Sequence, residues 1–225
     1  MSSMAAVPAE RPEHHHLATA GADLTVRSRR TLLVGTRLAL AANTTFNFAM
    51  LFSLLYLRLN NFNGGFKPDG VEAPDLGVGL ITIALQVVSM FAALAALGAV
   101  RRGAGAAKGM LAVSLLFGIA SVVARIYQEY HLGVGSELHK STYSATAAMW
   151  FAILVFEVIL GCLWLVFLLG SGRASDRGGP ERSTAGELIT EATVAVTQRH
   201  LRAFAEFWVY LTVLSTAVFL LIHFT

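Results

Sequence analysis

Long apolar runs, separated by short polar connections, dominate the chain. The five runs cover residues 38–59, 76–100, 109–130, 145–169 and 204–224. Each has roughly the 20 residues needed to cross a hydrocarbon core about 30 Å thick, because a helix rises about 1.5 Å per residue. A soluble fold could not bury this much apolar helix. The pattern therefore predicts an all-α, polytopic membrane protein built as a bundle of five transmembrane helices.

The composition is also that of a membrane protein. Of the 225 residues, 55% are hydrophobic and 14% are charged, and the mean hydropathy is +0.61. These values differ from the soluble average in the direction expected for membrane proteins. Residues 1–30 are polar and lack periodicity, which predicts a disordered cytoplasmic tail. Residues 31–225 then form one five-helix transmembrane domain, because the polar connections are too short for a second domain.

Positive charges are distributed unevenly between the two sides of the predicted bundle. Of the 17 Lys and Arg residues, 13 lie in the N-terminal segment and in the second and fourth connections, and 4 lie toward the other side. Because cytoplasmic loops retain positive charge, this asymmetry predicts an N-terminus inside and a C-terminus outside. It also accounts for the isoelectric point near 9.3, which therefore does not indicate nucleic-acid binding.

The fourth connection contains a further helical pattern. Thr184 and Glu187 have the spacing of a capping box. The apolar residues that follow at helical intervals are Leu188, Ile189, Ala192 and Val196. We therefore expect a short inner helix over residues 187–198 that runs into the fifth apolar run.

Polar side chains inside the apolar runs are the candidates for function. Glu157 falls near the centre of the fourth run, where an ionised group costs about 2.5–3.5 kcal/mol on insertion scales and usually faces protein or water. Three explanations are open: a proton or ion relay, a polar contact to another subunit, or a protonated carboxyl hydrogen-bonded within the bundle. Asn43, Thr44, Thr45 and Asn47 lie at comparable depth in the first run. Their presence favours hydrogen-bonded packing.

A second pair of charged residues lies near the outer end of the third run. Arg125 and Glu129 are four residues apart, so they share a helix face and can pair near the outer surface. This pair favours a structural over a catalytic role. Glu129, His131, Glu137 and His139 together match no standard ligand spacing, so no metal site is predicted.

Catalytic and redox machinery is not evident in the sequence. Cys162 is the single cysteine, so one copy of the chain can form neither a disulfide nor a thiolate cluster. We find no nucleophile, general-base pair or phosphate loop, and no ligands for haem. Catalytic, cofactor-binding and metal-binding residues are therefore all predicted to be absent from this chain.

Short motifs occur at the ends of several apolar runs. They comprise Gly35 to Phe48 with Tyr56-Leu57-Arg58, a loop with Phe66 and Pro68, Gly118 followed by Gln128-Glu129-Tyr130, Tyr143-Ser144, and Phe207-Trp208-Val209-Tyr210. In this order they resemble the five-span form of subunit III of haem-copper oxidases such as cytochrome c oxidase. The resemblance covers the chain from Gly35 to the C-terminus.

The resemblance implies a non-catalytic accessory subunit in the respiratory electron-transport chain of a bacterial plasma (inner) membrane. Such a subunit flanks the catalytic subunit, which holds haem and copper, and contacts other subunits of the respiratory complex. It binds no cofactor itself, holds structural phospholipid between its helices, and supports stability and proton delivery in aerobic respiration. The chain departs from the family at Thr45, where a buried Glu is usual, and at Leu154 and Glu157, where the family carries two His. No proton-handling role follows from those family groups here.

Two alternative functions are compatible with the sequence. One is the equivalent accessory subunit of a nitric oxide reductase. The other is a small membrane transporter or channel, with Glu157 and the Asn/Thr group of the first run lining a pathway. The sequence has no internal repeat and no helix broken by Gly or Pro of the kind that forms transporter sites, which disfavours the second alternative.

Overall fold

The computed structural model describes residues 13–61, 66, 74–102, 106–131, 141–175 and 184–224, with side chains described from residue 31 onward except at 131, 171–175, 184–197 and 224. Within these residues the chain forms helices and no strand. The helices are α1 (Glu13–Leu59), α2 (Leu76–Arg101), α3 (Ala107–His131), α4 (Thr142–Ser175) and α5 (Thr184–Phe224). All five helices of this described part contain a segment long and apolar enough to cross a membrane. The prediction of an all-helical chain with five helices able to span a membrane is thereby confirmed.

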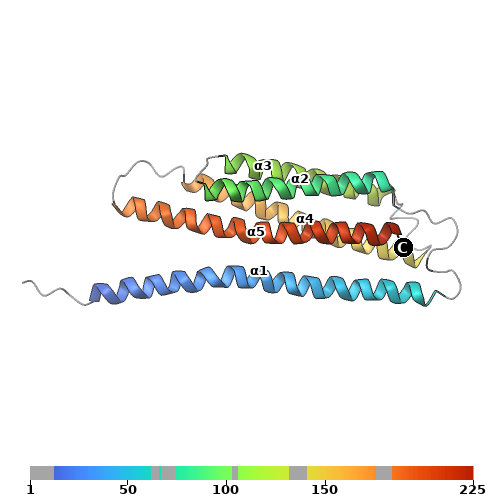
Figure 1. Ribbon diagram of the computed structural model, residues 1–225, viewed down its shortest axis with the longest axis horizontal. Coiled ribbons are helices and arrows are strands. Elements are labelled where there is room, and N and C mark those ends of the chain that lie inside the picture. Colours follow the sequence, from blue (N-terminus) through green and yellow to red (C-terminus); the bar gives the residue numbers. More distant parts are fainter. Residues whose placement is uncertain are drawn as a thin grey trace, which may run out of the picture.

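The helices run side by side, and their directions alternate along the chain (Figure 1). The main contacts join α2 to α3 and α5, α3 to α4, and α4 to α5. Helix α1 lies along one edge of this four-helix group and has its main contacts with α5. The C-terminal ends of α1 and α5 lie at the same end of the bundle, opposite the N-terminal end of α1.

Two helices extend beyond their apolar runs. Helix α1 begins at Glu13, which differs from the predicted disordered tail for residues 13–30, whereas residues 1–12 lie outside the described residues. No proline occurs between Pro12 and Pro68, and the Ala, Leu and Arg of this stretch favour helix. Helix α5 is continuous from Thr184, so it includes the stretch for which a short inner helix is predicted. The side chains of the predicted capping box are outside the described set.

The polar and apolar faces of α3 are reversed relative to those of an amphipathic helix in a soluble protein. Its buried positions recur every three or four residues at Leu111, Ser114, Gly118, Ser121, Arg125 and Gln128. Its exposed positions include Leu116, Ile119, Val123 and Ile126. Small and polar residues thus face the other helices, as expected where close approach and hydrogen bonds drive helix association in lipid.

A reciprocal hydrogen-bonded pair joins α2 to α3. Ser89 Oγ donates to the Ser114 carbonyl at 2.6 Å, and Ser114 Oγ donates to the Ser89 carbonyl at 2.9 Å. The Trp208 indole of α5 donates to Ser89 Oγ at 3.0 Å. One pair of small side chains therefore allows close contact of two helices and satisfies the buried indole of a third.

The Trp208 ring lies over glycines of two neighbouring helices. A Cβ atom at Gly161 of α4 would overlap this ring, and one at Gly118 of α3 would lie 3.3 Å from it. The indole is fully buried and packs against Phe204, with ring centroids 5.1 Å apart. These glycines supply the space for the largest side chain of the core.

Side-chain hydrogen bonds link the helix ends that lie at the same end of the bundle as the C-terminal end of α5. Tyr143 Oη donates to the Ile222 carbonyl at 2.9 Å, and its ring contacts buried Phe66 edge-on. Gln128 Nε2 donates to the Asp75 carbonyl at 3.1 Å. Asp75 in turn caps α2 through the Gly77 N–H. These contacts hold the ends of α2, α4 and α5 in a common position.

Candidate functional site

A buried group of polar side chains lies between the helices, and every helix of the described chain contributes to it. We call it the polar cluster and define it as Asn43 and Asn47 of α1, Gln86 of α2, Arg125 and Glu129 of α3, Glu157 of α4 and Ser215 of α5. It contains the charged and amide residues singled out within the apolar runs, together with two residues that were not singled out.

Arg125 is the positive charge of the polar cluster. It is 4% exposed, because it stands on the inward face of α3. Its Nη2 atom donates to Gln86 Oε1 and to Ser215 Oγ, both at 3.3 Å. The guanidinium therefore connects α3 to α2 and α5. Within the described side chains Arg125 forms no direct ion pair with Glu129, in contrast to the pairing that their spacing suggests.

Two carboxyl groups interact with the positive charge of Arg125. Glu129, one turn further along α3, and Glu157 of α4 each interact electrostatically with Arg125. Glu157 is 8% exposed. A buried arrangement of one cation with two acidic groups requires either a proton or another positive charge for neutrality.

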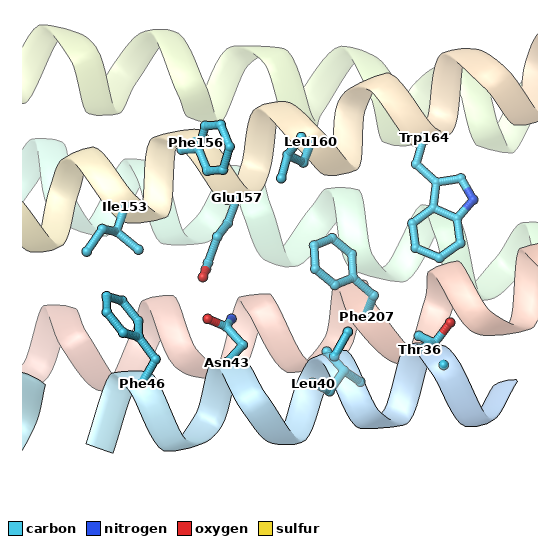
Figure 2. Close-up of a pocket in the computed structure, with 12 residues that line it drawn as sticks. Thr36, Leu40, Asn43, Phe46, Ile153, Phe156, Glu157, Leu160, Trp164 and Phe207 are labelled. Atoms are coloured by element: carbon cyan, nitrogen blue, oxygen red, sulfur yellow. The ribbon is translucent and has the colours of Figure 1, made fainter. Parts of the chain in front are cut away.

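Glu157 also faces a groove between α1 and the neighbouring helices. The groove has a volume of about 690 Å³ and is lined by Gly35, Thr36, Ala39, Leu40, Asn43, Phe46, Ile153, Phe156, Glu157, Leu160, Trp164 and Phe207. Figure 2 shows Glu157 reaching from α4 toward Asn43 of α1, with apolar side chains on either side. The groove is thus a mostly apolar space with one carboxyl at its middle.

Asn43 and Asn47 form the α1 side of the polar cluster. Asn47 Nδ2 donates to the Asn43 carbonyl at 2.8 Å and to Asn43 Oδ1 at 3.1 Å. Asn47 is 4% exposed although α1 is the least buried of the described membrane-crossing segments. Of these two amides, Asn43 faces Glu157 of α4 (Figure 2).

Several buried polar atoms of the polar cluster have no hydrogen-bond partner among the described residues. They are Asn47 Oδ1, Gln86 Nε2, Glu129 Oε1 and Glu157 Oε2. Buried polar groups in proteins are nearly always paired with protein or with ordered water. Unpaired atoms from four helices therefore leave hydrogen-bonding capacity of this region unused.

The threonines near Asn43 have different positions. Thr44 Oγ1 donates to the Leu40 carbonyl at 2.7 Å and lies 3.1 Å from Tyr210 Oη, so it helps to join α1 to α5. Thr45 is exposed and donates to the Ala41 carbonyl of its own helix at 3.0 Å. The structure therefore does not bring Thr45, a candidate from the sequence, into the polar cluster.

Gln86 and Ser215 belong to the polar cluster but were missed by sequence reasoning. Both are polar residues within apolar runs, which is the signal that singled out Glu157. Neither is ionisable, and serine and glutamine are common in helix interfaces, so the sequence alone did not set them apart. Their pairing with Arg125 is a consequence of how α2, α3 and α5 pack.

A separate ion-pair group joins α1 to α5. Arg37 of α1 donates through Nε and Nη2 to the two oxygens of Glu206 of α5, each at 3.2 Å. Arg202 Nε donates to the same carboxylate at 3.3 Å. Two arginines surround one carboxylate, so the group has excess positive charge. Arg37 and Glu206 also adjoin the groove residues Thr36 and Phe207 in sequence.

The residues considered for a metal site are mostly beyond what the structure describes. Glu137 and His139 lie outside the described residues, and the side chain of His131 is not described. Glu129 belongs to the polar cluster. Cys162 is buried in α4, close to where a Cβ at Gly118 would lie. Among the side chains that are described, no three His, Cys, Asp or Glu residues are grouped to hold a metal ion.

Comparison with models of known protein families, and with curated proteins, found no match to this chain.

Proposed function

We propose that this chain is a non-catalytic accessory subunit of a respiratory haem-copper oxidase, of the subunit III type, in a bacterial plasma membrane. The groove between α1 and α4 is the observation that supports this proposal most directly. The motif resemblance from Gly35 to the C-terminus implies a subunit that holds phospholipid between its helices, and this groove is a suitable place for such a lipid.

The groove has the chemistry that a phospholipid would require. Its walls are aliphatic and aromatic over most of their length, which suits an acyl chain. The excess positive charge of Arg37 and Arg202 around Glu206 lies beside residues of the same groove, where it would attract a lipid phosphate. We propose that one lipid lies with its chain in the groove and its headgroup near these arginines.

The proposed orientation has the N-terminus in the cytoplasm and the C-terminus outside. The alternating helix directions place the two connections rich in Lys and Arg at the same end as the start of the membrane-crossing part of α1. Retention of positive charge on the cytoplasmic side supports this assignment. It would place the Arg37–Glu206–Arg202 group at the cytoplasmic headgroup level.

Co-purification tests the proposed function. We expect the tagged chain, extracted from its native membrane in mild detergent, to retain a larger subunit whose absorption spectrum shows haem. The catalytic subunit is identified by mass spectrometry, which also separates a terminal oxidase from a nitric oxide reductase. Isolation as a haem-free homo-oligomer without such a partner would contradict the proposal.

Filling the groove tests its occupation by lipid. We expect Ala39→Phe to reduce tightly bound phospholipid by at least about one molecule per chain, because the new ring would occupy the space between α1 and α4. Ala41→Phe is the matched control, since Ala41 is exposed on the same helix but does not line the groove. Phosphorus analysis after extensive detergent exchange provides the measurement. Equal lipid content in both variants and the unaltered protein would rule out lipid in the groove.

A further inference from the structure

The four unpaired atoms of the polar cluster require partners of both kinds. Gln86 Nε2 is a donor, whereas Asn47 Oδ1, Glu129 Oε1 and Glu157 Oε2 are acceptors when the carboxyls are ionised. Gln86 is 1% exposed, Asn47 4% and Glu157 8%. An unpaired polar atom in such a place is unfavourable, because it has given up its hydrogen bonds to water. Water both donates and accepts, and it typically makes about three hydrogen bonds at buried sites of this kind.

The charges of the polar cluster do not balance without a proton. Arg125 carries one positive charge, and Glu129 and Glu157 carry one negative charge each when ionised. The described groups that α1, α2 and α5 present to the cluster are neutral: Asn43 and Asn47, Gln86, and Ser215. Two ionised carboxylates beside one guanidinium would leave a net negative charge in a setting where an unbalanced charge is costly. One added proton makes the group neutral.

We propose that the polar cluster binds ordered water and holds one exchangeable proton, which resides on Glu157 while Arg125 and Glu129 stay charged. Glu129 is one turn from Arg125 and half-buried near the C-terminal end of α3, where a carboxylate is more easily solvated. Glu157 is deeper and faces the amide of Asn43 (Figure 2). A protonated Glu157 supplies a hydrogen-bond donor beside Asn43, whose side chain is itself bonded to Asn47.

The positions of the two carboxyl groups explain how the proposed proton can exchange. Glu129 is the member of the polar cluster nearest the C-terminal end of α3, and Glu157 lines the groove. Arg125 interacts with both carboxyls without a direct ion pair to either within the described side chains. Bridging water between these groups would provide a path for the proton from Glu157 to the C-terminal end of α3. This inference does not rest on the proposed function, because it concerns groups of this chain alone.

Infrared absorption of the full-length protein in films of ether lipids, which have no ester carbonyl, tests the proposal when it is recorded at neutral pH in H₂O and in D₂O. The unaltered protein should show the C=O stretching band of a protonated carboxyl, and this band should shift in D₂O. Glu157→Gln should abolish the band. Glu206→Gln is the matched control and should retain it, because Glu206 belongs to the separate ion-pair group with Arg37 and Arg202.

Glu129→Gln tests why Glu157 is protonated. The proton is held either to balance the charges of Arg125 and Glu129 or only because Glu157 is buried. With one acidic group left beside Arg125, the polar cluster is neutral when Glu157 is ionised, so the band should again be lost although Glu157 is still present. A band that persists in Glu157→Gln or in Glu129→Gln would overturn the proposal. If either variant fails to fold, the unaltered protein alone decides: absence of the band, or a band that does not shift in D₂O, would overturn it equally.

Discussion

Arg125→Met is expected to lower the free energy of unfolding by about 3–5 kcal/mol, the range found when one partner of a buried charged group is removed. Methionine fills a similar length of space, so the loss comes from electrostatics and hydrogen bonds. Gln86 Oε1 and Ser215 Oγ lose their donor, and Glu129 and Glu157 lose the only cation that the described side chains place near both. Reversible denaturant unfolding in mixed micelles measures the change.

Two comparisons show whether the polar cluster is the cause. Arg37→Met is the matched control. It is expected to leave the free energy of unfolding unchanged, because Arg37 is mostly exposed and its ion pair with Glu206 is solvated. In a Glu129→Gln/Glu157→Gln background, Arg125→Met should cost clearly less, since no uncompensated carboxylate remains. An equal loss in both backgrounds would show that packing, not charge balance, accounts for the effect of Arg125.

Gly161→Ala is the second substitution with a large expected effect. The added Cβ overlaps the Trp208 ring, which is buried between α4 and α5 and hydrogen-bonded to Ser89. Relief of the overlap requires either a shift of the helices or a new ring position. Such overpacking typically costs about 1–3 kcal/mol, so we expect a clear fall in the melting temperature, measured by size-exclusion chromatography after heating, and altered tryptophan fluorescence.

Gly170→Ala provides the matched control on the same helix. No heavy atom lies within 4 Å of a Cβ built at Gly170, and alanine is a better helix former than glycine by about 1 kcal/mol in water. We therefore expect unchanged or slightly raised stability. If Gly161→Ala melts at the same temperature as Gly170→Ala, the close contact between Trp208 and α4 does not contribute to stability as inferred.

The helices could be predicted from the chain because the bilayer imposes a simple requirement. A segment must be apolar and about 20 residues long, and its backbone must satisfy its own hydrogen bonds. The apolar runs meet this requirement without reference to any neighbour. The start of α1 at Glu13 could not be predicted in the same way, since residues 13–30 lie outside the apolar run and no membrane constraint applies to them.

The polar cluster could be predicted only in part. Glu157, Arg125 and Glu129 were identifiable because a charge within an apolar run is costly wherever the run packs. The same reasoning placed Thr45 with Asn43 and Asn47 by depth alone. Depth does not specify which face of a helix points inward, and Thr45 stands on the exposed face whereas Asn47 stands on the buried one. That choice depends on how α1 is rotated against α5.

The amino-acid sequence by itself determined the number and the approximate extent of the membrane-crossing helices, and the presence of ionisable groups within them, because these properties depend on single residues and their solvent. Tertiary structure alone decided that Arg125 bonds to Gln86 and Ser215 rather than pairing with Glu129, and that Trp208 lies over Gly161. These contacts join residues far apart in the chain. They follow from helix rotation and close packing, which in lipid depend on complementary shape between helices and not on the hydrophobicity of any one of them.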